Sequence, residues 1–98
     1  MRYPYTVAVL SERIRQHYPD APVKLEAVNR AAFQRGDYQE GHFPAYLLWM
    51  LHELQTFEDA GQAGRWLGWA LRSLEILKVT TLQENRDLVR ADKKAGAV

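Results

Sequence analysis

The residues of this 98-residue chain that could bind a metal ion are His42, His52 and Glu53. Helical metal sites place their ligands at i and i+3 or i+4, so that both side chains leave the same face. Here the two histidines are ten residues apart, and Glu53 directly follows His52, so their side chains diverge around a helix. We therefore expect no metal ion and no other cofactor.

Residues for nucleophilic or acid–base catalysis are equally sparse. The chain has no cysteine, and its only serines are Ser11 and Ser73. Ser73 falls on or near the apolar side of its expected helix, and the neighbouring acids Glu58 and Asp59 are typical of solvated charge at a turn. The sequence contains no glycine-rich phosphate loop and no nucleophile elbow. We expect no enzymatic activity.

Tryptophan is the residue type that most directly indicates a binding surface here. Trp49, Trp66 and Trp69 lie within 21 residues of one another. Aromatic side chains and arginine are enriched at the centres of protein–protein interfaces, but they also fill protein cores. Which of these roles each tryptophan takes depends on the elements that position it.

Apolar spacing predicts helices along the whole chain. Val7, Leu10, Ile14 and Tyr18 form the stripe of a first helix, with Pro4 in its first turn. A second, weaker helix is expected over Val23–Arg35.

The later helices have clearer signals. A third is predicted from Pro44 to Phe57 and a fourth from about Arg65 to Val79, with the preceding "EDAGQAG" read as a turn or frayed start. Thr81 and Glu84 form a capping box that opens a fifth. No alternating strand pattern competes, so we predict one all-α domain, residues 1–98, built as a compact bundle of four to five helices. Residues 1–4 and 91–98 are expected to be frayed.

Helical wheels divide the tryptophans between two environments. In the third helix the apolar arc runs through Leu47, Leu51 and Leu54, and the opposite side holds Ala45, Trp49, His52, Glu53 and Thr56. In the fourth helix Trp66 and Ser73 fall on or near the inward side. Trp69 borders an outward cluster that contains Arg65, Gly68, Arg72 and Glu75.

Two interpretations of these outward aromatics remain open. In one, Trp49 lies under the first helix or the N-terminal "RYPY", and Gly68 admits a neighbouring helix of the same chain. In the other, the two helices bind a partner protein through one surface, with Trp49 and Trp69 as anchors. The predicted partner-binding residues are Trp49, His52, Glu53, Arg65, Gly68, Trp69 and Arg72.

Two further alternatives use other parts of the chain. Arg86, Arg90, Lys93 and Lys94 make a basic edge that could contact nucleic acid, although Glu84, Asp87 and Asp92 interleave with it and the formal net charge is only +1. Nucleic acid is therefore the less favoured partner. A homodimer through Gly68 and Trp69 is the other alternative. No stretch approaches the roughly 18 uncharged apolar residues of a membrane span, and we expect a cytoplasmic protein.

The segment "AGRWLGWALRSLEILKVTTLQENRDLVR" (Ala63–Arg90) resembles a segment of small phage and prophage accessory proteins of unknown function. In those proteins an "RWLG" opens one helix and a "TL-x-E-x-R" helix follows, and the upstream "LLWMLHEL" and "AGQAG" are similar as well. The resemblance covers about Phe43–Arg90. It implies a non-enzymatic protein of a phage or prophage that binds a host or phage protein and modulates a host process or host defence, and it supplies no catalytic residues.

Overall fold

A computed structural model describes residues 1–21 and 42–98, and four α-helices account for most of them. They are α1 (Pro4–His17), α3 (His42–Leu54), α4 (Ala60–Ile76) and α5 (Leu82–Lys94). The structure confirms the predicted all-α bundle. The helix expected over Val23–Arg35 lies outside the described residues.

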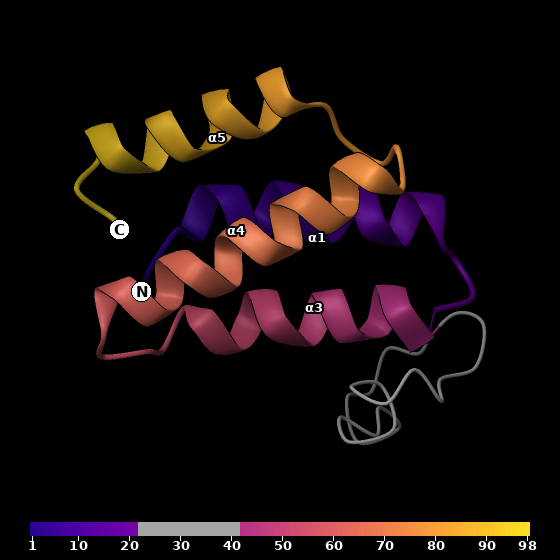
Figure 1. The fold of residues 1–98 in the computed structure, drawn as a ribbon, viewed down its shortest axis with the longest axis horizontal. Helices are drawn as coiled ribbons and strands as arrows, with labels where there is room; N and C mark the ends of the chain where they lie inside the picture. Colours follow the sequence, from indigo (N-terminus) through magenta and orange to yellow (C-terminus); the bar gives the residue numbers. More distant parts are fainter. Residues whose placement is uncertain (22–41) are drawn as a thin grey trace.

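The helices run antiparallel to their packing neighbours (Figure 1). α1 and α4 both pack on α3, and α5 packs on α1. α4 and α5 make little direct contact with each other, so the bundle is open between these two helices.

α3 supplies the centre of the apolar core. Leu47, Leu51 and Leu54 are fully buried, together with Leu10 of α1 and Leu74 of α4. The buried surface of α3 is wider than the predicted apolar arc, and both α1 and α4 pack on this helix. Ala45, which the wheel placed on the outward side, is completely buried.

α1 begins at Pro4, as predicted, but its first turn is completed by a residue from the other end of the chain. Tyr3 has a left-handed backbone (φ 50°) and offers no side-chain cap. The carboxylate of Asp92 in α5 accepts hydrogen bonds from Thr6 N at 2.8 Å, Thr6 Oγ1 at 2.6 Å and Tyr5 N at 3.2 Å. The backbone N–H groups of Tyr5 and Thr6 are donors that the start of a helix leaves unpaired, and a negative charge there is favoured by the helix dipole.

The two ends of the described chain are held together by further hydrogen bonds. Tyr3 N donates to Ala97 O at 2.6 Å, and the guanidinium of Arg2 donates to the carbonyl oxygens of Phe57, Glu58 and Val98, each at 2.7 Å. α5 itself continues to Lys94. These contacts fix the start of α1 between the end of α3 and the end of α5.

α4 begins at Ala60, five residues before the predicted Arg65, so the prediction of a turn or frayed start was wrong. Glycines at 61 and 64 weaken the local helix signal. Asp59 compensates as the N-cap, because its Oδ1 accepts from Gly61 N at 2.8 Å and Gln62 N at 3.2 Å.

The turn between α4 and α5 contains a second left-handed residue. Lys78 has φ 60°, Val79 N donates to Leu74 O at 2.9 Å and Lys78 N donates to Glu75 O at 3.1 Å. This is the Schellman ending, which usually places glycine at the left-handed position. The predicted capping box follows and is confirmed, since Thr81 Oγ1 accepts from Glu84 N at 3.1 Å.

Candidate functional site

Six aromatic rings form a continuous row along the seam between α3 and α4, and we call this set the aromatic row. Ring centroids of successive neighbours are 4.7–6.1 Å apart, within the range of favourable aromatic pairs. In order of contact its members are Phe43, Trp69, Tyr46, Trp49, Trp66 and Phe57.

The row follows from helical spacing on two antiparallel helices. Phe43, Tyr46 and Trp49 are three residues apart on α3, and Trp66 and Trp69 are three apart on α4. Because the helices run in opposite directions, the two sets interleave, and Tyr46 contacts both Trp49 and Trp69. The structure thus brings the two tryptophans predicted as anchors onto one seam.

Burial changes along the row. Tyr46 is only 6% exposed, and Trp49 and Trp66 are half-buried, whereas Trp69 remains 44% exposed. The ring of Trp49 lies between those of Tyr46 on α3 and Trp66 on α4. Trp69 meets Phe43 and Tyr46 edge-on, and its orientation is therefore fixed by packing.

The remaining predicted partner-binding residues are exposed. His52 and Glu53 lie on the outer side of α3, and Arg65, Gly68 and Arg72 on the outer side of α4. Arg72 approaches Glu75 with Nη1 to Oε1 at 3.6 Å, and its side chain is 74% exposed. Because the Arg72 side chain is largely in solvent, this contact does not hold it in place.

Gly68 does not admit a neighbouring helix from residues 1–21 or 42–98, which corrects one of the two interpretations for the part of the chain that the structure describes. A Cβ atom built at Gly68 meets no atom of the described residues within 4 Å, and Gly68 is exposed. The glycine therefore leaves a bare backbone position one residue before Trp69. Its cost in helix stability is not offset by a close approach within the described part of the chain.

Two of the polar residues considered for chemistry serve the fold. Ser73 Oγ donates to Trp69 O at 2.9 Å, and Asp59 caps α4. No group of three or more potential metal ligands gathers within residues 1–21 and 42–98. The side chain of His42 lies outside the described features.

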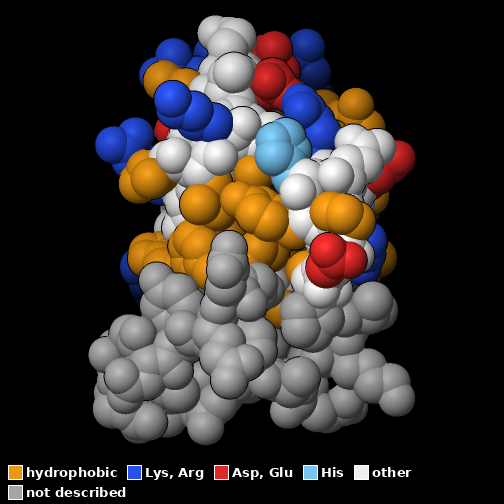
Figure 2. Space-filling model, turned by 90° about the vertical axis from the view of Figure 1, so that its right-hand side faces the viewer, with side chains coloured by type: hydrophobic (Ala, Val, Ile, Leu, Met, Phe, Trp, Pro, Cys, Tyr) orange, Lys and Arg blue, Asp and Glu red, His pale blue; other side chains and the backbone are white. Residues whose placement is uncertain are grey.

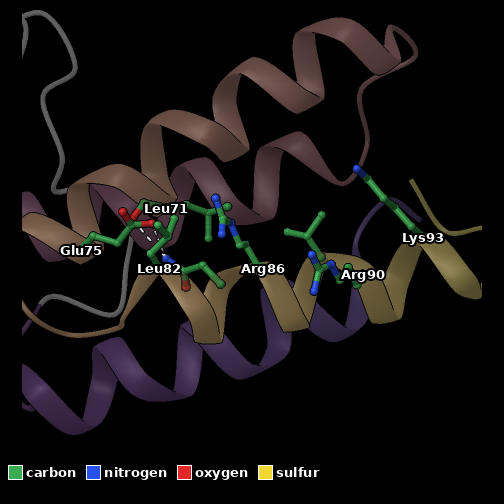
Figure 3. A pocket seen from close by; sticks show the side chains of 8 residues that line it. Leu71, Glu75, Leu82, Arg86, Arg90 and Lys93 are labelled. Carbon is green, nitrogen blue, oxygen red and sulfur yellow. Dashed lines mark hydrogen bonds between the residues drawn. The ribbon is translucent and has the colours of Figure 1, made fainter.

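The predicted basic edge of α5 faces a groove that the sequence did not reveal. Arg86, Arg90 and Lys93 line an opening of about 290 Å³ between α4 and α5, whereas Lys94 is exposed outside it (Figure 3). Leu82 and Val89 at i and i+7 are the signal that could have indicated it, because this spacing puts two apolar side chains on the same helical face as Arg86 and Arg90.

One end of the bundle carries a second concentration of apolar side chains. Figure 2 views the end at which α1 and α4 finish and α3 begins, and hydrophobic side chains gather in the middle of that view with Lys and Arg side chains above them. Ile76, at the last turn of α4, is 67% exposed.

No family model, curated protein or solved structure matches this chain. Among the helices that the structure describes, none is both long enough and apolar enough to cross a membrane.

Proposed function

We propose that this chain is a small non-enzymatic protein of a phage or prophage that binds another protein and modulates a host process or host defence. Its place of action is the bacterial cytoplasm. The phage assignment rests on the sequence resemblance over Phe43–Arg90, and the binding assignment rests on the surface built by α3 and α4.

The observation that carries the binding proposal is the setting of Trp69. A tryptophan that keeps 44% of its surface exposed while two rings fix its orientation is a pre-organised anchor. Such residues lose little conformational entropy on binding, and large aromatic anchors dominate interface energies. Arg65 and Arg72 flank it as exposed donors, and Gly68 lets a partner backbone come close.

The test is a tagged pull-down from nuclease-treated bacterial lysate, read by mass spectrometry at low and moderate salt. We expect one dominant protein to be retained by the unmodified chain and lost with Trp69→Ala. Ile76→Ala is the matched control, because it truncates another exposed apolar side chain of the same helix, outside the aromatic row. Equal loss with both variants would contradict the proposal.

Self-association is separated by solution mass. Light scattering that shows a dimer for the unmodified chain and a monomer for Trp69→Ala would assign the same surface to a second copy of this chain. If both chains are monomers, the surface around Trp69 is expected to bind a different protein.

A further inference from the structure

The opening between α4 and α5, which we call the α4–α5 groove, has apolar and basic walls. Its residues come from two helices that each pack mainly on another partner. They are Leu71 and Glu75 of α4, and Leu82, Asn85, Arg86, Val89, Arg90 and Lys93 of α5.

α5 presents two different stripes to its surroundings. Asn85, Leu88 and Asp92 form the stripe that turns inward, where Asp92 caps α1. Leu82, Arg86, Val89, Arg90 and Lys93 are spaced at i, i+4, i+7, i+8 and i+11, which is one helical face. This second face borders the groove and spans about 16 Å at 1.5 Å per residue.

The charge of the groove is strongly one-sided. Three cations stand along α5, and Figure 3 shows Arg86 extending toward Leu71 on the opposite wall. Glu75 is the acid that lines the groove, and its carboxylate is already engaged. Its Oε2 accepts from Asn85 Nδ2 at 2.9 Å, and its Oε1 faces Arg72.

A buried polar atom in the groove lacks a hydrogen bond. Asn85 is 2% exposed, and its Nδ2 reaches Glu75 and the carbonyl of Leu71, but its Oδ1 has no partner among the described residues. A buried acceptor left unpaired costs about 1–3 kcal/mol.

We infer that the α4–α5 groove binds an acidic amphipathic helix of a protein partner, about three turns long. Apolar side chains of that helix contact Leu71, Leu82 and Val89, and its Asp or Glu side chains pair with Arg86, Arg90 and Lys93. This is the helix-in-groove mode of recognition, in which apolar anchors at i, i+3 or i+4 and i+7 fill the floor and charges set the specificity.

A peptide fits these walls better than nucleic acid does. A phosphate backbone offers no apolar group for Leu71, Leu82 and Val89.

The groove is separate from the aromatic row. Leu71 follows Trp69 by two residues, a rotation of about 200° around α4, so the two side chains leave nearly opposite sides of the helix. This inference therefore stands without the proposed function, and a protein with both surfaces can hold two partners or two segments of one partner.

The probe is a fluorescein-labelled helical peptide of about three turns, with Leu on one face and Glu beside it. Controls are the same peptide with Lys in place of each Glu, and a short DNA duplex. Fluorescence anisotropy with the full chain at moderate salt should show the acidic peptide binding about tenfold more tightly than the basic one.

Variants locate the binding. Arg86→Glu and Leu82→Ser should each weaken the acidic peptide about tenfold, through lost charge pairing and lost apolar contact. Lys94→Glu is the matched control, since it makes the same kind of charge reversal on α5 outside the groove, and it should change the affinity by less than about twofold. Circular dichroism melts confirm that each variant is folded.

Several outcomes would overturn the inference. These are no binding of the acidic peptide, equal binding of both peptides, equal weakening by Arg86→Glu and Lys94→Glu, or tighter binding of the duplex, which would assign the basic edge to nucleic acid. Trp69→Ala should leave peptide binding unchanged whether or not it abolishes the pull-down. Loss of peptide binding in that variant would move the peptide to the aromatic row.

Discussion

The helices pack in the order α4, α3, α1, α5. Different interactions stabilise the two outer pairs, α5 on α1 and α4 on α3. α5 is tied to α1 by directed hydrogen bonds from Asp92, and the chain ends are joined by Tyr3 and Ala97. α4 is tied to α3 by rings and aliphatic side chains such as Leu51 and Leu67.

The two helix pairs should therefore differ in how well they tolerate substitutions. A carboxylate that caps a helix must keep its oxygen atoms within hydrogen-bond distance of fixed donors, so small chemical changes are costly. Apolar packing depends on volume and accepts substitutions that conserve it. Four predictions test this comparison, in order of decreasing effect.

Asp92→Ala should give the largest loss, about 4 kcal/mol of unfolding free energy, because three donors at the start of α1 lose their acceptor inside the protein. Asp92→Asn keeps one acceptor oxygen and should cost about half as much. Urea denaturation measures both. A loss below about 1 kcal/mol for Asp92→Ala would show that water replaces the cap.

Leu51→Ala should cost about 3 kcal/mol, because it leaves a cavity at a completely buried site of α3. Leu51→Met conserves volume and should cost less than about 1.5 kcal/mol. The comparison to make is between the losses in unfolding free energy caused by the conservative variants Leu51→Met and Asp92→Asn. Similar losses for Leu51→Met and Asp92→Asn would remove the distinction between the two interfaces.

α5 also has a Schellman ending, in which Ala97 N donates to Asp92 O at 2.9 Å and Gly96 N donates to Lys93 O at 3.1 Å. The left-handed residue is Lys78 after α4 and Gly96 after α5. Lys78→Gly should raise the unfolding free energy by about 0.5–1 kcal/mol, and Gly96→Ala should lower it by about 1 kcal/mol. Thermal melts of the two variants should move in opposite directions. A destabilising Lys78→Gly would mean that the lysine side chain makes a compensating contact.

Arg13→Ala should have the smallest effect, below about 1 kcal/mol, although Arg13 forms an ion pair with Glu84 that links α1 to α5. Both side chains are more than a third exposed, at 35% for Arg13 and 40% for Glu84. The cost should shrink further at high salt. If Arg13→Ala lowered the unfolding free energy as much as Asp92→Ala, the ion pair would stabilise the contact between α1 and α5 as strongly as the Asp92 cap does.

Sequence reasoning recovered the parts of the fold that depend on local signals. Pro4 at the start of α1 and the Thr81–Glu84 capping box are readable because their partners lie within a few residues. The early start of α4 was missed because Gly61 and Gly64 masked the cap at Asp59. For the candidate site, the outward cluster around Gly68 and Trp69 follows from helical spacing, but its contacts with α3 do not.

The sequence by itself determined that this chain forms amphipathic helices and where most of them begin, since periodicity and capping are local properties. The tertiary structure decided what spacing along one helix cannot state. It placed Asp92 at the start of α1, interleaved the rings of α3 and α4, and left α4 and α5 apart with a groove between them. These features depend on which helices become neighbours, and that choice is made by the packing of the whole core.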